Sequence, residues 1–286
     1  MTYQFTFLYP SIEKDFEDES KEAKERYYMY KDLPLHNLTI GFVLGLWLIK
    51  DNAVNVNHSY HFNPLINYNS TANRTLNFTL SSGEIKSIYF NESEINNSIS
   101  LMYDIYSILL KKSDLTKISS SESYGTTYWS IEDFISDLFS KGNTSSYARA
   151  FICIQEARST GFIPTKISKY CACLECLFAI KEKHSNQIKD ITSKLLAKNS
   201  KEEQQIASDM GDAYGIRSDI DHGGEIKYFR DLKNEEVREL SKRLDNYVRQ
   251  TIKYVLNNPD LNYTMQDIEH KASTRKHFKD LTYQKK

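Results

Sequence analysis

The sequence predicts an α+β fold in which a small β-rich N-terminal domain is followed by an antiparallel α-helical bundle. The hydrophobic residues repeat about every two positions in the first part of the chain, and at helical spacing from Ser130 onward. The helical segments are joined by short connections, and consecutive amphipathic helices joined in this way pack as antiparallel bundles. We therefore divide the chain into a β-rich domain, residues 1–125, and a helical domain, residues 126–286.

Four short segments of the N-terminal part have the composition of β-strands. Asn, Ser and Gly, which favour turns, bound these segments: Leu38–Ile49, Tyr60–Ile66, Thr75–Leu80 and Ile85–Phe90. In Thr75–Leu80 the apolar residues alternate with polar ones, as on a half-buried strand. Leu38–Ile49 is the longest apolar run but is too short to cross a bilayer. Gly41 and Gly45 argue against a helix there, so we interpret the run as a buried strand.

Helical spacing dominates the rest of the chain. A helix is expected near Ile95–Leu110, followed by a Ser-rich linker over Lys111–Thr127. The first bundle helix is expected from Ser130, with the buried stripe Ile131, Phe134, Ile135, Leu138 and Phe139. Five more are expected over residues 145–158, 164–178, 188–196, 201–222 and 234–255, with Pro259 ending the last. Gly211 and Gly215 lie inside the helix expected over residues 201–222, where they indicate either a close approach of another backbone or a break.

Bulk composition narrows the class of protein. A hydrophobic content of 40% with 26% charged residues is that of a folded chain rather than a disordered one. The net charge of -1 gives no global basic field, so any contact with nucleic acid must use a local patch. Residues 270–286 carry six Lys or Arg against one Asp, which indicates either an RNA contact or a frayed end. The N-terminus lacks the basic start and apolar core of a secretory signal, so we expect a cytoplasmic protein without membrane association.

The four cysteines are expected to be free thiols. Cys153 is isolated in the sequence, whereas Cys171, Cys173 and Cys176 form a cluster. On a helix the first two residues of this cluster point about 200° apart, so they do not converge on one metal ion. We interpret all four as small buried residues of a helix interface in a reducing compartment, and we predict no metal site.

The most informative segment is Tyr214–Gly223, in which Arg217 and His222 bracket four residues. Arginine carries a permanent charge and a fork of N–H donors suited to a phosphate. Histidine transfers protons near neutral pH. The spacing also has a purely structural interpretation, in which Arg217 pairs with Asp221 on the helix surface and His222 interacts favourably with the helix dipole. The spacing alone leaves both interpretations open.

The residue pattern of this segment resembles a motif of a known family. Tyr214-x-x-Arg217-Ser218-x-x-x-His222-Gly223 resembles the Arg-x4–6-His signature of HEPN domains, in particular the Apea-like branch. The upstream segment from Lys166 to Phe178 is similar to the helix that precedes the motif in that branch. The resemblance covers residues 126–257. One departure is Ser218, because many active HEPN ribonucleases have Asn, Asp or His directly after the arginine.

The resemblance implies a metal-independent endoribonuclease that uses no cofactor. Arg217 would hold the phosphate, and His222 would act as the general base or acid. Tyr214 and Ser218 would position the phosphate or a hydroxyl group, and Asp221 would orient the arginine. HEPN domains usually form dimers, so the partners it implies are RNA and a second copy of the chain, bound through the helical bundle.

The resemblance also implies a biological setting and one alternative. Family members often act in bacterial defence or toxin-like growth arrest, where residues 1–125 would sense a ligand or bind a regulatory protein. Some HEPN-like bundles instead only dimerise or bind a partner. In that alternative Arg217 and His222 would be structural residues of an interface.

Overall fold

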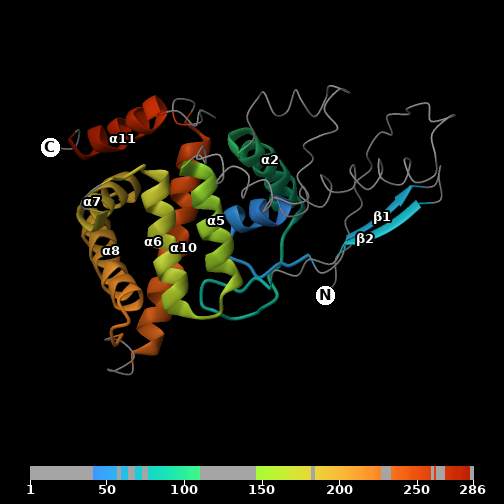
Figure 1. Cartoon of the computed structure of the whole chain (residues 1–286), viewed down its shortest axis with the longest axis horizontal. Helices are drawn as coiled ribbons and strands as arrows, with labels where there is room; N and C mark the ends of the chain where they lie inside the picture. The colour runs from blue at the N-terminus through green and yellow to red at the C-terminus, as the bar shows by residue number, and fades with distance from the viewer. Residues whose placement is uncertain are drawn as a thin grey trace.

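The computed structural model describes residues 41–56, 59–63, 68–72, 77–109, 146–181, 184–226, 233–258, 261 and 268–283. This part of the chain is mainly helical (Figure 1). Its elements are a helix over residues 41–49, β1 (Ser59–Asn63), β2 (Tyr68–Ala72), α2 (Glu92–Leu109), α5 (Ser146–Ser159), α6 (Ile163–Leu177), α7 (His184–Leu196), α8 (Ser200–Asp221), α10 (Asn234–Leu256) and α11 (Ile268–Tyr283).

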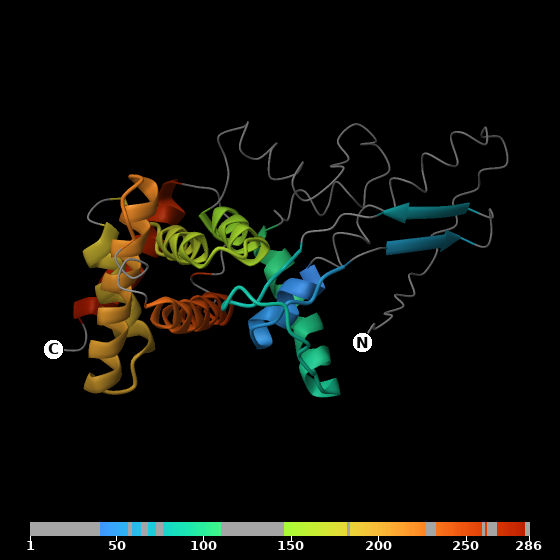
Figure 2. The same cartoon turned by 90° about the horizontal axis from the view of Figure 1, so that it is seen from below.

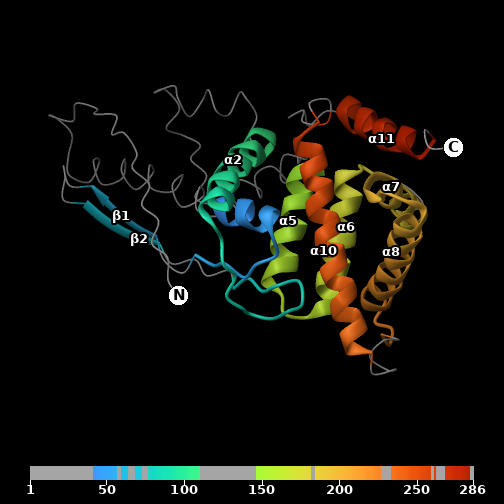
Figure 3. The ribbon, with the colours of Figure 1, turned by 180° about the vertical axis from the view of Figure 1, so that it is seen from behind.

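Helix α6 lies at the centre of the helical part. It packs against α5, α8 and α10, and α7 packs against α8 and α10 (Figures 1 and 3). The apolar stripe predicted for α6 is confirmed, because each of its members is at most 1% exposed: Ile167, Tyr170, Cys171, Leu174, Leu177 and Phe178. The helices expected over residues 145–158, 164–178, 188–196, 201–222 and 234–255 are all present, with ends within a few residues of those predicted.

The prediction of a β-rich N-terminal domain is wrong. The described residues before α5 contain the helix over residues 41–49, α2 and one sheet of two strands. In that sheet β1 pairs antiparallel with β2, with Tyr60 opposite Thr71, and it lies apart from the helices (Figure 2). β1 overlaps the predicted strand Tyr60–Ile66. The described part of Thr75–Leu80, residues 77–80, and all of Ile85–Phe90 form no strand.

The largest error concerns Leu38–Ile49, whose described residues form a helix. This helix packs against the protein on two opposite sides, so it needs apolar residues all around its axis rather than on one face. Leu44, Trp47 and Leu48 belong to the main core, whereas Phe42 and Leu46 pack with Met102 of α2. A periodic pattern cannot separate a short buried strand from a helix buried all round. Gly45 does not break the helix: a Cβ there would collide with the carbonyl oxygen of Ser98, so this glycine permits close packing on α2.

Two expectations lie outside the described residues. They are the helix from Ser130, with its stripe from Ile131 to Phe139, and the linker over Lys111–Thr127. The proposed boundary near residue 125 lies there too and stays a prediction.

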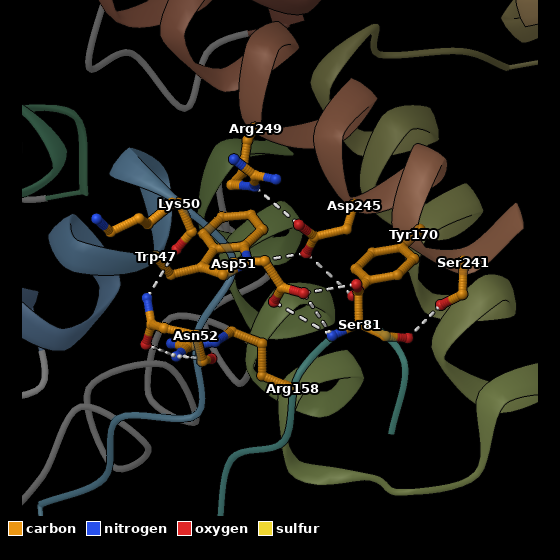
Figure 4. Close-up of polar contacts among 10 residues, drawn as sticks. All are labelled: Trp47, Lys50, Asp51, Asn52, Ser81, Arg158, Tyr170, Ser241, Asp245 and Arg249. Atoms are coloured by element: carbon orange, nitrogen blue, oxygen red, sulfur yellow. Dashed lines mark hydrogen bonds and ion pairs between the residues drawn. The ribbon is translucent and has the colours of Figure 1, made fainter. Parts of the chain in front are cut away.

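A buried carboxylate joins the helix over residues 41–49 to the bundle (Figure 4). Asp245 of α10 accepts hydrogen bonds from Trp47 Nε1 at 2.8 Å and from the Tyr170 hydroxyl at 3.1 Å, and it pairs with Arg249 Nε at 2.7 Å. Trp47, Tyr170 and Asp245 are each fully buried. Because solvent does not reach these groups, we interpret the cluster as structural rather than as a binding site.

Two further segments are docked beside this carboxylate. Arg158, at the end of α5, donates from Nη2 to the backbone and side-chain oxygens of Asn52 at 3.3 and 3.2 Å. Its guanidinium lies 4.2 Å from the centre of the Phe78 ring, and burial lowers its pKa to about 10. Ser81 donates from Oγ to Asp51 at 2.6 Å and accepts from Ser241 Oγ at 2.7 Å through its carbonyl oxygen. Residues 51–52 and 78–81 are therefore held to the bundle by polar contacts.

Lys166 is a further buried charged residue and lies between α5 and α6. It is 0% exposed, and its Nζ donates to the carbonyl oxygen of Ala157 at 2.7 Å. Burial lowers the pKa of Lys166 to about 8, although the nearby carboxylates of Asp245 and Asp51 favour the charged form. The folded chain therefore releases this proton more easily than the unfolded chain does.

This buried amine predicts a pH dependence of stability. Between about pH 8 and pH 10.5 the unfolded chain binds more protons at Lys166 than the folded chain, so the free energy of unfolding rises with pH across that window. Lys166→Met removes the titration and should flatten the rise. Urea unfolding at several pH values measures the slope, with Lys169→Met, at a surface ion pair with Glu156, as the control. An equal slope in the wild type and Lys166→Met would contradict this account.

The basic C-terminus is helical rather than frayed over residues 268–283. In α11, Phe278 is fully buried, and its ring centre lies 4.7 Å from that of Phe178. Arg275 donates from Nε to the carbonyl oxygen of Ala179 at 2.8 Å. These contacts hold α11 across the end of α6.

Candidate functional site at the C-terminal end of helix α8

Helix α8 carries the motif, and both of its ends are capped. Asn199 caps the N-terminus by accepting the Glu202 N–H at 2.9 Å. At the other end Gly223 N–H donates to Ile220 O at 3.2 Å, and Gly224 N–H donates to Asp219 O at 2.7 Å. This is the Schellman arrangement, and it requires the left-handed conformation that Gly223 adopts with φ of 67°. The glycine pair therefore ends the helix directly after His222.

The two interior glycines do not break α8, and they mark no close approach within the part of the chain that the structure describes. The helix is continuous through Gly211 and Gly215. Of the residues that the structure describes, none has an atom within 4 Å of a Cβ built at either position. The predicted break is therefore wrong, no backbone among the described residues approaches these glycines closely, and α8 extends without interruption to the motif.

Arg217 is held by carboxylates from two helices. Its Nη1 forms an ion pair with Glu175 Oε1 of α6, and its Nε lies 3.4 Å from Asp221 Oδ2, one turn along α8. The guanidinium carbon lies 5.6 Å from the centre of the Tyr214 ring. The Arg217–Asp221 pair is the contact that we expect if the spacing of the motif has a purely structural role. Glu175 adds a less exposed partner, at 14% side-chain exposure against 50% for Asp221.

Tyr214 and Arg217 share Glu175 as an acceptor. The Tyr214 hydroxyl donates to Glu175 Oε1 at 2.7 Å. Burial, together with the charge of Glu175, raises the pKa of Tyr214 well above its usual value, so this hydroxyl stays protonated. Burial is the largest single influence and opposes the charge of Arg217, but the hydrogen bond and charge of Glu175, together with Tyr214 and Cys171, outweigh it and raise the pKa of Arg217. At neutral pH the group is therefore a neutral phenol and a fixed guanidinium on one carboxylate.

Ser218 and His222 lie on other sides of the helix. By the helical period, Asp221 follows Arg217 by about 40° around the axis, Ser218 by about 100° and His222 by about 140°. Both of these side chains are exposed, and the backbone N–H of His222 donates to the Ser218 carbonyl oxygen at 3.1 Å. The structure thus brings Tyr214, Arg217 and Asp221 together, and it leaves Ser218 and His222 facing solvent at the helix end.

Glu175 is the site residue to which the sequence analysis gave no role. It lies within the segment Lys166–Phe178 that resembles the helix preceding the HEPN motif. The sequence feature that could have revealed Glu175 is its position as a charged residue between Leu174, which is fully buried, and the half-buried Cys176. A carboxylate so close to a buried stripe usually has a partner, because an unpaired buried charge is costly.

The described residues contain no group of three or more His, Cys, Asp or Glu side chains that are placed to hold a metal ion. Among the helices in the described part of the chain, none combines the length and the apolar character needed to cross a membrane. No family model, curated protein or solved structure matches this chain.

Proposed function

We propose that this chain is a metal-independent endoribonuclease of the HEPN type, with Arg217 and His222 as its catalytic residues. The observation that carries the proposal is the arrangement at the end of α8. A guanidinium is fixed by a shielded carboxylate, and an exposed imidazole lies five residues further along at a capped helix end. A fixed cation and a solvent-accessible proton-transfer group are what phosphodiester cleavage requires.

In the proposed reaction the 2′-hydroxyl of a ribose attacks the adjacent phosphorus, and the bond to the 5′-oxygen breaks. The products are a 2′,3′-cyclic phosphate and a 5′-hydroxyl. His222 takes the proton of the 2′-hydroxyl or gives one to the leaving 5′-oxygen. Arg217 binds the phosphate; its guanidinium has five N–H donors, and the contacts with Glu175 and Asp221 use two of them. Glu175, Tyr214 and Asp221 orient the arginine, and Ser218 lies where it can contact the RNA.

The proposed enzyme is a homodimer. One histidine supplies a base or an acid at a given moment, whereas the reaction needs both. A two-fold symmetric dimer formed through the helical bundle supplies the second group, because the partner subunit's His222 can face the His222 of the first chain. Arg217 and His222 point about 140° apart around α8. The arginine of one chain and the histidine of the other can therefore face the same phosphate more easily than both side chains of one chain.

The alternative is a non-catalytic module that dimerises or binds a partner. One specific observation favours it: Arg217 already has two carboxylate partners, Glu175 and Asp221. In that case the arginine stabilises the contact between α8 and α6, and His222 belongs to an interface. RNA cleavage is then absent in every variant.

The proposal also includes the cellular compartment and the biological role of the enzyme. We place it in the cytoplasm, in bacterial defence or toxin-like growth arrest, with residues 1–125 responding to a ligand or a regulatory protein. The polar contacts of residues 51–52 and 78–81 with the bundle support this role for the N-terminal part. They offer a route by which an event there reaches α5 and α10.

The test is incubation of the purified protein with total RNA in excess EDTA, followed by gel electrophoresis. We expect discrete cleavage by a species whose mass, from light scattering, is twice the chain mass of 33.3 kDa. Active protein of strictly monomeric mass would refute the composite site alone. Absence of cleavage at all protein concentrations would favour the non-catalytic module.

A further inference from the structure

The two carboxylates that bind Arg217 are themselves held unequally. Glu175 belongs to another helix, is 14% exposed in its side chain, and also accepts the Tyr214 hydroxyl at 2.7 Å. Asp221 is on the same helix as Arg217, is 50% exposed, and lies 3.4 Å from Nε, which is long for a hydrogen bond. Among the residues that the structure describes, Arg217 is the only hydrogen-bond or ion-pair partner of the Asp221 side chain. Glu175 is therefore a fixed partner of the arginine, whereas Asp221 is a displaceable one.

The contacts of Arg217 leave one edge of its guanidinium half open. Glu175 binds Nη1 and Asp221 binds Nε, whereas Nη2 contacts no acceptor within the described part of the chain. Nε and Nη2 lie on one edge of the planar group, and such a pair of donors can bind two oxygens of a carboxylate or a phosphate at once. Asp221 uses only one donor of this edge. A phosphate that used both donors would have to take the place of Asp221 at Nε.

The position of Asp221 along α8 does not favour a structural role. It is the last residue of the helix, where the negative end of the helix dipole disfavours a carboxylate. Its one ion pair is exposed and lies within the helix, and such pairs contribute little to stability. Replacing this carboxylate with a neutral amide should therefore leave the stability of the protein unchanged.

We propose that Asp221 occupies the place of the RNA phosphate on Arg217 in the free protein, and that it gives way to this phosphate when RNA binds. The proposal rests on the function proposed above and adds to it a positioning residue that limits the affinity for RNA. Glu175 keeps the guanidinium in place throughout, while the exposed Asp221 side chain turns away into solvent. RNA has to overcome both the competition for Nε and the repulsion between the carboxylate and the phosphate.

The test is direct binding of a fluorescent 2′-O-methyl RNA, which has no free 2′-hydroxyl and is not cleaved by the proposed reaction. Asp221→Asn removes the charge and keeps the shape. We expect this variant to bind the RNA about two- to fivefold more tightly than the wild type, the equivalent of one exposed ion pair, with an unchanged melting temperature. The matched control is Asp212→Asn, an equal change of charge at an exposed position of α8 for which the structure shows no contact with Arg217. The control should bind like the wild type.

Two further measurements separate competition from a general effect of charge. In the Arg217→Gln background the gain from Asp221→Asn should disappear, because no guanidinium is left to compete for. In cleavage assays with an all-ribose RNA the gain should appear as a lower KM rather than a higher kcat, as for a change in binding alone. If Arg217→Gln fails to fold, the comparison of Asp221→Asn with Asp212→Asn decides.

Three results would overturn the proposal: equal binding by Asp221→Asn and the wild type, weaker binding by Asp221→Asn, or the same gain in Asp212→Asn. Weaker binding would show that Asp221 holds the arginine in place also when RNA is bound. Cleavage of RNA by the wild-type protein alongside any of these results would leave the proposed function standing. If no form of the protein binds or cleaves RNA, the proposed function and this inference fail together.

Discussion

Replacing His222 with alanine is expected to lower the rate of RNA cleavage by about 10² to 10⁴, the usual cost of losing a general base or acid. The fold should be little affected, because the side chain is exposed at the capped end of α8. We expect a change in the free energy of unfolding within about 1 kcal/mol, as for other surface substitutions. The measurement is cleavage of a fluorescent RNA in EDTA, with a melting curve for each protein. Cleavage at the parental rate would show that His222 is structural.

Arg217→Lys is expected to be nearly as harmful to cleavage. Lysine keeps the positive charge beside Glu175 but lacks the planar fork that binds two oxygens at once. A matched control is Arg243→Lys, since Arg243 of α10 also pairs with a carboxylate, Asp209, at a partly exposed position. The control should cleave normally. Equal loss in both variants would indicate a general effect of the substitution rather than a role of Arg217 in the reaction.

Asp245→Ala is expected to cause the largest loss of stability, about 3–5 kcal/mol, as when one partner of a buried ion pair is removed. The change leaves the Trp47 and Tyr170 donors unsatisfied in the core and removes the partner of Arg249. Asp245→Asn keeps the shape and one acceptor, so its effect should be smaller. Urea unfolding measures both.

The control for this experiment is Glu239→Ala, which removes a surface ion pair with Lys242 on the same helix. Exposed pairs contribute little, so we expect a change within about 0.5 kcal/mol. If Asp245→Ala were as mild as Glu239→Ala, the buried carboxylate would not be what ties the N-terminal helix to the bundle.

The sequence predicts the described helices of the bundle well, and in α6 and α10 the reason is one clear apolar stripe. The six predicted stripe residues of α6 are all buried, and the glycine pair after His222 marks the true end of α8. The N-terminal part has no such signal. The helix over residues 41–49 is buried on two sides, so its apolar residues show no stripe, and Gly45 is needed for packing rather than for a turn.

The candidate site was only partly predictable, for a different reason. Tyr214, Arg217 and Asp221 share a face of α8 by the helical period, which spacing alone indicates. Their common partner Glu175 is 42 positions before Arg217, and only the packing of α6 against α8 brings it there. The links from Asp245 to Trp47 and Tyr170 depend in the same way on tertiary packing, across 198 and 75 positions.

The central claim is RNA cleavage by 2′-hydroxyl attack, and the ends of the products test it most directly. A short RNA and the same RNA with a 2′-deoxy residue at the cleavage site are incubated in EDTA. Wild-type protein and His222→Ala, purified in parallel, are compared, and the products are identified by mass spectrometry. We predict a 2′,3′-cyclic phosphate on one fragment and a 5′-hydroxyl on the other, from wild-type protein and the all-ribose RNA alone. Fragments with 3′-hydroxyl and 5′-phosphate ends, equal cleavage by His222→Ala, or intact RNA throughout would contradict the claim.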